Sequence, residues 1–483
     1  MRSICSLVLF FVVYLATAQA PSDSLFHLPD SARPFTLENF YEVILRHHPV
    51  ARQANLLPEM ARQEIRLARG HFDPKLEASY LLKQYNGTEY YRLFDATLKA
   101  PTRSPVTPFV GLERNTGEQL NPEHYISSEY DYKQLYAGIT LPLGQGLLTD
   151  DRRTALRQAE LFRTLMEAEQ VKIINKLLLD AAKTYWSWYH SYYNYRLATN
   201  TLSVAEEIFR RTRSNFEGGE VAPVDTVQAK ITYLERAVSR QEAYTHYLNN
   251  GLAVSAFLWD SLRNPVELLP HHVPVQETAV FILTPAALQE LLDQAKTNHP
   301  ELRKLNVKLQ QLTYDQQLAK EFLKPKLTVS YYMLNQPFNP EGASNAFTFN
   351  DNFKLGVDFS FPIFLRKERS KVAQFRLKIG NTEYDRELTS RQIVNDLMAA
   401  YNQLANNGIV LQQQQQMVEH YHRLMGAELT NLENGESDLF KINVQQEKLF
   451  QAESKLIKTM AEYEKQKAVL YWSAGVRPLQ KPE

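Results

Sequence analysis

Four short segments of the chain alternate apolar with polar residues. In the first of them, Leu76, Ala78 and Tyr80 are separated by the polar residues Glu77 and Ser79. A period of two predicts a β-strand with one apolar and one polar face. By this pattern, strands are predicted over residues 75–83, 133–143, 326–334 and 353–363.

The segment between the first two predicted strands, residues 84–131, is rich in residues that interrupt regular structure. Pro101, Pro105, Pro108 and Gly111 all lie within it. Such residues are typical of turns and loops. We therefore expect a long loop here. The chain as a whole is then expected to have four strands.

A very long helix is predicted after the second strand. Residues 150–217 contain neither proline nor glycine, and at about 1.5 Å per residue a helix of this length would extend about 100 Å. Gly218 and Gly219 end it, and a second helix is predicted over residues 224–259. Aromatic residues cluster along the first helix between Tyr185 and Tyr195, and they are interpreted as packing between helices.

A second helical hairpin follows the fourth predicted strand. Its helices are predicted over residues 366–434 and 438–474, and Gly435 lies in the turn between them. Two hairpins of this length do not fit an ordinary sheet sandwich. The predicted fold class is therefore mainly α, with four strands that belong to a separate sheet.

The second half of the chain repeats the order of the first. His48-Pro49 opens a helical stretch that leads into the first predicted strand, and His299-Pro300 does the same before the third. Leu76 and Leu327 occupy corresponding strand positions, 327 − 76 = 251 residues apart. Repeats of solenoid proteins are about 20–50 residues long. This repeat is therefore a duplicated half-domain.

The duplication sets the expected domain boundaries. Repeat 1 covers residues 35–260 and repeat 2 covers residues 283–475. A proline-rich linker, residues 261–282, joins them. An N-terminal extension over residues 19–34 precedes repeat 1, and a C-terminal tail over residues 476–483 follows repeat 2.

The first 18 residues have the pattern of a secretory signal peptide. A basic Arg2 is followed by an apolar run and by the small residues Ala16-Thr17-Ala18, which suit a cleavage site. The apolar run is shorter than the roughly 20 residues that span a bilayer. The single cysteine of the chain, Cys5, lies inside this segment, so the exported chain is expected to have no disulfide and no cysteine metal site.

Charge and motifs exclude several functions. Lys plus Arg and Asp plus Glu both number 54, and removal of the signal leaves 53 − 54 = −1. This balance argues against nucleic acid as a partner. The sequence has no phosphate-binding glycine loop and no nucleophile–base pair, and its adjacent histidines do not share a helix face. We expect no enzymatic activity, catalytic residue, cofactor or metal site.

The number of predicted strands implies an oligomer. Strands of about ten residues can cross the core of a bilayer, but four strands cannot close a barrel, which takes about eight. Backbone groups at an open edge would lose their hydrogen bonds in lipid. Several copies must therefore pool their strands, with the apolar faces toward outer-membrane lipid and the polar faces, which carry Lys354 and Asp358, toward water.

These features together resemble the TolC family of outer-membrane efflux and secretion proteins. The resemblance rests on Phe35-Thr36-Leu37-Glu38 and Leu283-Thr284 at the openings of the repeats, on two strands per half, and on the turn segments that contain Gly218-Gly219 and Gly435. It implies a homotrimer whose 12-stranded transmembrane β-barrel in the outer membrane continues into a long α-helical barrel through the periplasm. It also implies passive transport from an inner-membrane transporter, through a periplasmic adaptor protein, to the outside of a bacterial cell.

The resemblance further suggests roles for the ends of the helical hairpins. The turns at Gly218, Gly219 and Gly435 correspond to the periplasmic tips that meet the adaptor. Polar side chains just before the second turn are candidates for the ring that narrows the periplasmic aperture. These candidates are Glu428, Asn431 and Glu433.

Two other functions use long helices. A periplasmic adaptor, or membrane fusion protein, has a helical hairpin, but it would have one hairpin and a compact β-rich segment. A secreted coiled-coil structural protein would have sustained heptads and no amphipathic strands. The two hairpins, each preceded by a pair of strands, favour the efflux channel.

Overall fold

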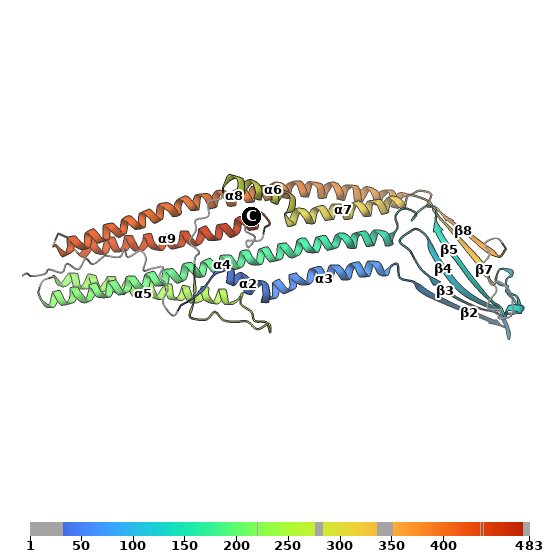
Figure 1. The fold of residues 1–483 in the computed structure, drawn as a ribbon, viewed down its shortest axis with the longest axis horizontal. Coiled ribbons are helices and arrows are strands. Elements are labelled where there is room, and N and C mark those ends of the chain that lie inside the picture. The colour runs from blue at the N-terminus through green and yellow to red at the C-terminus, as the bar shows by residue number, and fades with distance from the viewer. Residues whose placement is uncertain are drawn as a thin grey trace, which may run out of the picture.

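The strands and the ends of the long helices lie at opposite ends of an elongated molecule (Figure 1). In this computed structural model, the residues described are 32–219, 221–275, 284–335, 351–434, 436–437 and 439–476. The predicted signal peptide, Leu283 and Gly435 lie outside these residues. The chain therefore has three levels: a sheet, a middle region where the repeats open, and a pair of helical tips.

The opening of repeat 1 is fixed by two N-terminal caps. A short strand, β1 (Arg33–Phe35), leads into α2 (Leu37–His47), where the Thr36 hydroxyl accepts a hydrogen bond from the Asn39 amide at 3.2 Å. Helix α3 (Pro49–Gly70) follows at once, and His48 Nδ1 accepts from the Val50 amide at 3.2 Å. Both caps satisfy amides that a helix leaves unpaired at its start.

Repeat 2 opens in the same way. The Thr284 hydroxyl caps α6 (Pro285–Asn298) by accepting from the Ala287 amide at 3.3 Å, and His299 Nδ1 caps α7 (Pro300–Glu321). A proline occupies the first turn of each of these two helices, where its missing amide costs no hydrogen bond. The duplication predicted from the sequence is thus confirmed at the level of single caps.

The four long helices form the two predicted hairpins. They are α4 (Asp151–Glu217) with α5 (Pro223–Ser255), and α8 (Arg366–Glu433) with α9 (Leu439–Ser473). The hairpins lie side by side, because α4 packs against α9 (Figure 1). Within the part of the chain that the structure describes, none of the helices is long and apolar enough to cross a membrane.

One predicted helix end is wrong. Helix α5 ends at Ser255 and not at Trp259. Trp259 instead forms an isolated antiparallel bridge with Pro265, and the Asp260 side chain accepts from the Asn264 amide at 2.8 Å to close the turn between them. The side chain of Asp260 competes with the helix for backbone partners, which is typical of aspartate at turns.

The predicted linker, residues 261–282, is described up to residue 275, and this part has more regular structure than expected. It contains β6 (His272–Pro274), which pairs in parallel with β1. The Tyr185 hydroxyl of α4 lies 2.7 Å from the carbonyl of Phe35 and accepts from the Val275 amide at 3.0 Å. The linker therefore returns to the opening of repeat 1 and is tied there.

The main core lies in the middle of α4. Tyr185, Trp188 and Tyr189 are fully buried, together with Phe40 and Ile44 of α2. Their rings meet mostly edge to face, for example Tyr185 and Trp188 at 5.8 Å between centroids. The interpretation of this aromatic cluster as packing between helices is confirmed.

The sheet contains six strands, in the antiparallel order β2-β3-β4-β5-β7-β8. The predicted count of four strands is therefore wrong, and so is the long loop over residues 84–131. Two further strands lie there because Asn86 and Gly87, with φ of 48° and 78°, make a tight hairpin turn. The six strands are β2 (Lys75–Tyr85), β3 (Thr88–Lys99), β4 (Thr107–Thr116), β5 (Lys133–Pro142), β7 (Lys326–Asn335) and β8 (Phe353–Ser360).

The last strand is shorter than predicted. Strand β8 ends at Ser360, and Pro362 follows two residues later. Proline has no amide hydrogen to donate to a neighbouring strand, so the pairing stops before residue 363. Between β4 and β5, two short 3₁₀ turns at Pro122–His124 and Ser128–Tyr130 make up the rest of the connection.

Candidate functional site: the sheet faces and the helical tips

One face of the six-stranded sheet, the apolar face, carries large exposed apolar side chains on five of its strands and on the edge strands most of all. Leu76 on β2 is 74% exposed and Phe359 on β8 is 68% exposed. Residues that are paired on neighbouring strands lie on the same face of a sheet. The register, followed across all six strands from Leu76 and Leu98 to Leu327 and Phe359, places these residues on one face. The exposed members are Leu76, Tyr80, Leu82, Phe94, Leu98, Val110, Ile139, Phe353, Leu355, Val357 and Phe359. An exposed apolar surface of this extent marks a contact with lipid or protein.

The opposite face, the polar face, carries charged and hydroxyl side chains. Lys354 and Asp358 lie on it, as predicted, opposite Tyr332 and Thr328. On β2 and β3, Glu77 and Lys99 form an ion pair at 2.6 Å. The polar members of this face include Lys75, Glu77, Ser79, Asp95, Thr97, Lys99, Glu113, Asn115, Gln134, Tyr136, Thr140, Lys326, Thr328, Ser330, Tyr332, Lys354, Asp358 and Ser360. Leu81, Leu93, Phe109 and Leu334 lie among them. This face suits water.

A close-packed cluster joins β3, β4 and β5 on the polar face. The ring of Tyr136 lies over Gly111, where an added Cβ would come within 2.2 Å of the ring. The Tyr136 hydroxyl donates to Asp95 Oδ2 at 2.6 Å. The rings of Phe109 and Tyr332 pack beside it, 4.7 Å apart. The side chains of neighbouring strands therefore fit one another here.

The first helical tip is the turn between α4 and α5. Gly218 continues the helical backbone, whereas Gly219 has φ of 82°, a conformation that glycine adopts without steric cost. Pro223 then begins α5, and the Asp225 carboxylate accepts from the Ala222 amide at 3.2 Å. The two glycines proposed as the tip do lie at the turn.

The second tip, between α8 and α9, brings together two of the three aperture candidates. The Glu428 carboxylate accepts a hydrogen bond from the Ser437 hydroxyl, and the Asn431 carbonyl accepts from the Glu436 amide at 2.8 Å. Both residues are half-buried. Glu433 is the last residue of α8, and its side chain lies outside the described part of the structure. Glu428 and Asn431 therefore close the turn of their own chain.

Both tips also expose apolar side chains, which the sequence reasoning missed. Phe216, Val224 and Val227 flank the first turn, and Leu429 and Phe440 flank the second; Phe440 is 63% exposed. Phe216 interrupts an otherwise polar segment of the sequence, whereas Val224 and Phe440 have apolar neighbours and carry no such signal. Exposed apolar residues at the end of a helical hairpin suit contact with another protein.

Two helices expose apolar stripes along their length. On α5, the stripe has the spacing of a heptad: Val224, Val227, Ile231, Leu234 and Val238, each 50–66% exposed. On α8, Leu377, Tyr384 and Leu388 are each more than 70% exposed. A helix stripe of this kind is stable in water only when another helix covers it. Within the described chain, neither stripe is covered.

One ion pair joins the two hairpins. Arg236 of α5 lies 2.5 Å from Glu447 of α9, and its guanidinium stacks on Phe450 at 5.2 Å. Partial burial alone raises the pKa of Glu447, but the hydrogen bonds from Arg236 and Gln451 outweigh it and hold that pKa below the ordinary value. The charged pair therefore connects repeat 1 to repeat 2 near the tips.

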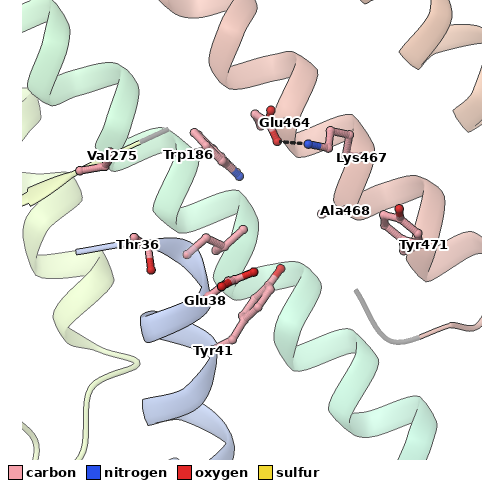
Figure 2. Close-up of a pocket in the computed structure, with 10 residues that line it drawn as sticks. Thr36, Glu38, Tyr41, Trp186, Val275, Glu464, Lys467, Ala468 and Tyr471 are labelled. Atoms are coloured by element: carbon pink, nitrogen blue, oxygen red, sulfur yellow. Dashed lines mark ion pairs between the residues drawn. The ribbon is translucent and has the colours of Figure 1, made fainter. Parts of the chain in front are cut away.

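A small pocket lies in the middle region, between α2, α4 and α9 (Figure 2). Its volume is about 190 Å³. Tyr41 and Trp186 lie on one side, and the Glu464–Lys467 ion pair at 2.9 Å lies on the other. The Tyr41 hydroxyl and Trp186 Nε1 are buried without a partner in the described structure, and burial raises the pKa of Tyr41. The pocket is wide enough for water molecules, which would satisfy these two polar groups.

His48 and His422 contact other side chains of the chain. Among the described residues, no group of three metal-binding side chains comes together. His422 contacts Glu453 across α8 and α9 at 2.9 Å, and His48 stacks on Phe257 at 5.7 Å. Burial lowers the pKa of His48, and that of His299, which favours the neutral ring that each helix cap requires.

Part of the chain is similar in sequence to a known protein family. Residues 291–476 match the family model for the outer membrane efflux protein. The match covers most of repeat 2. This match confirms the family expected from the residues, and proteins of the family are channels and not enzymes. No curated protein matches the chain in sequence.

Solved structures show the same fold over nearly the whole chain. The CmeC outer membrane channel of Campylobacter jejuni is 14% identical, with a TM-score of 0.61 over 92% of this chain and 87% of that one. The open state of the MtrE outer membrane channel of Neisseria gonorrhoeae is 14% identical, with a TM-score of 0.65 over 92% and 90%. VceC of Vibrio cholerae, an outer membrane protein, is also 14% identical, with a TM-score of 0.61 over 91% and 96%. The efflux-channel fold therefore includes repeat 1, to which the family match does not extend.

Proposed function

We propose that this chain forms the outer-membrane channel of a tripartite efflux or type I secretion system. Copies of the chain, as a homotrimer, place their sheets in outer-membrane lipid and extend their helices into the periplasm. The observation that carries this proposal is the exposed apolar face of the sheet, backed by a polar face and joined directly to long helices. Substrates then pass from an inner-membrane transporter, through an adaptor protein, along the polar interior.

The uncovered stripes on α5 and α8 support assembly with other copies of the chain. They lie on the two different hairpins, so that a ring of copies brings the α5 stripe of one copy to the helices of the next. Coverage of the stripes removes large apolar side chains from water at about 25 cal/mol per Å². Closed rings of identical subunits are the usual outcome of such unlike surfaces.

The exposed apolar residues at the tips support contact with an adaptor. Phe216 lies in the last turn of α4 and Phe440 in the first turn of α9, so the two residues belong to different repeats. The ends of the two helical hairpins lie together at one end of the molecule, away from the sheet (Figure 1). A periplasmic adaptor identity for the chain itself is disfavoured, because an adaptor would have one hairpin. A secreted coiled-coil protein is disfavoured by the amphipathic sheet.

The first test is the oligomeric mass and membrane fraction of the full chain. We expect detergent-extracted protein from the outer-membrane fraction to have the mass of three copies by light scattering. A soluble monomer would refute the proposal. Ile231→Glu and Leu388→Glu, which place a charge in each stripe, should reduce the trimer fraction. Gln415→Glu, at an exposed polar position of α8, is the matched control and should leave the mass unchanged.

A further inference from the structure

The β3–β4 hairpin lies where the sequence predicts a long loop, over residues 84–131. We propose that this hairpin crosses the outer membrane as part of the channel wall, so that each copy contributes six strands rather than four. The inference rests on the proposed function, which places the sheet in the membrane. It follows from the height of the hairpin, its two faces and its attachment to β5.

The hairpin extends over the full height of the sheet. Strand β3 begins at the turn beside Tyr85 and pairs with β2 down to Lys99, which is opposite Lys75 at the end near the helices. Strand β4 then returns beside β5, from Thr107 opposite Thr140. The two strands have 12 and 10 residues, and a membrane-spanning strand needs about 9–11. A loop confined to the outer surface would not reach the helix side.

The hairpin also continues both faces of the sheet. Phe94 and Leu98 of β3 and Val110 of β4 lie on the apolar face and are each at least 36% exposed. Asp95 and Glu113 are paired with each other on the polar face. A hairpin with water on both sides gains no stability from a row of exposed apolar side chains that continues the apolar rows of β2 and β8. A hairpin within the membrane requires such a row on its lipid-facing side.

The hairpin is held to β5 by fitted side chains. Gly111 of β4 leaves the space that the Tyr136 ring fills, and Asp95 of β3 accepts the hydrogen bond of the Tyr136 hydroxyl at 2.6 Å. Aromatic side chains that cover a glycine on a neighbouring strand fix the register of a sheet. The hairpin is therefore a permanent part of the sheet and not a segment that folds back onto it.

The proposal changes the expected size of the ring. Among the described residues, β2 and β8 each have only one neighbouring strand, so they are the edges at which copies meet. Three copies of the six-stranded sheet give 3 × 6 = 18 strands, where the family resemblance implied 12. Barrel diameter grows roughly in proportion to strand number, so the ring would be about one and a half times as wide.

Site-directed spin labelling tests the position of the hairpin. In a Cys5→Ser background, the chain has no other cysteine, so a single introduced cysteine carries the only label. The test pair is Phe94→Cys, on the apolar face of β3, and its neighbour Leu93→Cys, on the polar face. The control pair is Val329→Cys and Ser330→Cys on β7, which has the same two faces. The full chain is reconstituted in phosphatidylcholine vesicles, and label accessibility to oxygen and to a water-soluble nickel complex is measured.

We expect the oxygen-to-nickel accessibility ratio at Phe94 to exceed that at Leu93 by the factor that separates Val329 from Ser330. Equal access of nickel to Phe94 and Leu93, with Val329 still in lipid, would overturn the six-stranded wall and leave the proposed function intact. Nickel access at Val329 as well would overturn the proposed function itself. If the variant with Cys5→Ser and Phe94→Cys fails to fold, it is recognised by loss of the trimer. Leu98→Cys, on the same face of β3, then replaces Phe94→Cys.

Discussion

The two repeats have the same caps and the same hairpins, but they differ in how completely a single chain buries them. In repeat 1, helix α4 packs against α3, α5, α7 and α9, and its core consists of large aromatic residues. In repeat 2, helix α8 packs against α6, α7 and α9, and its core is aliphatic, with Leu397 and Leu404 buried. Duplicated sequence thus gives one helix that is enclosed by its own chain and one that is left open on a side.

The difference shows where the chain needs other copies of itself. Leu377 and Leu388 of α8 remain exposed, whereas α4 buries Tyr185 and Trp188 completely. Buried apolar area contributes to the stability of the single chain, and exposed apolar area contributes to assembly. The α4 core of repeat 1 is therefore expected to determine the stability of the monomer, whereas the exposed stripes of α8 and α5 are expected to determine its capacity to associate.

The largest effect is expected from the core of repeat 1. Trp188→Ala removes a fully buried side chain and should lower the free energy of unfolding by about 3–5 kcal/mol. The measurement is the midpoint of thermal unfolding, followed by helical circular dichroism in detergent. The matched control is Trp472→Ala, whose side chain is 39% exposed in the single chain. Equal losses from the two variants would show that the aromatic core of α4 is not the main source of stability.

A second effect distinguishes the inner strand β5 from the edge strand β8 of the sheet. At Gly138 on β5, an added Cβ would lie 2.0 Å from the Tyr331 carbonyl oxygen, so Gly138→Ala must displace backbone and should cost about 1–3 kcal/mol. At Gly356 on β8, the nearest atom would be 3.9 Å away. Gly356→Ala should therefore be tolerated. Loss of the heat-resistant oligomer on gels is the measurement, and comparable losses for both alanines would contradict this packing.

A third effect concerns the link between the hairpins. Arg236→Met removes the partner of Glu447, whose side chain is 43% exposed, so solvent screening limits the loss to roughly 1 kcal/mol or less. Because the pKa of folded Glu447 is lowered, the pair stabilises the fold above the ordinary pKa of 4.5 and ceases to do so as the pH falls through the lower, folded value. The stability difference between wild type and variant should therefore shrink in acid. A difference that is constant with pH would refute the ion pair.

A fourth effect should be the same in both repeats. His48→Ala and His299→Ala each remove a helix cap, at about 0.5–2 kcal/mol. Burial lowers the pKa of both rings, so they stabilise the fold above the ordinary pKa of 6.5, and this contribution falls away as the pH drops below it. Each variant should have a weaker dependence of unfolding midpoint on pH between about 7 and 5 than the wild type. Opposite behaviour of the two variants would mean that the caps are not equivalent.

The long helices and the strands β2, β5, β7 and β8 could be predicted from the sequence, because their signals are local. A stretch without proline or glycine, such as residues 151–217, has few alternatives to a helix. The duplication added confidence in the order of elements, since each half is an independent copy of the pattern. Threonine is a common N-terminal cap, so the cap at Thr36 also has a local signal, whereas the cap at His48 does not.

The β3–β4 hairpin could not be predicted in the same way because two local signals conflict. Asn86-Gly87 favours a hairpin, but Pro108 argues against an inner strand, where proline cannot donate a hydrogen bond. The structure places Pro108 near one end of β4, opposite Ile139, and its carbonyl still accepts from the Ala100 amide at 2.9 Å. The tertiary pairing therefore overrides the local rule.

The tip candidates show a different limit of sequence reasoning. Charge and spacing directed attention to Glu428 and Asn431, which the structure finds in hydrogen bonds within their own turn. The exposed apolar residues Phe216 and Phe440 were overlooked, because exposure is a property of the folded chain and not of a segment. A functional role can be predicted from sequence more readily for a polar residue than for an apolar residue, whose burial is not known before the fold.

A hairpin inserted into this sheet has a consequence for ancestry. The strands alternate in direction from β2 to β8, so the two edges of one copy run in opposite directions and can meet edge to edge in the antiparallel sense. Addition of two strands preserves this alternation, whereas addition of one would reverse it at every seam. The perimeter of such a ring can therefore change over evolution only by whole hairpins, and each insertion in the gene is multiplied by the number of copies around the axis.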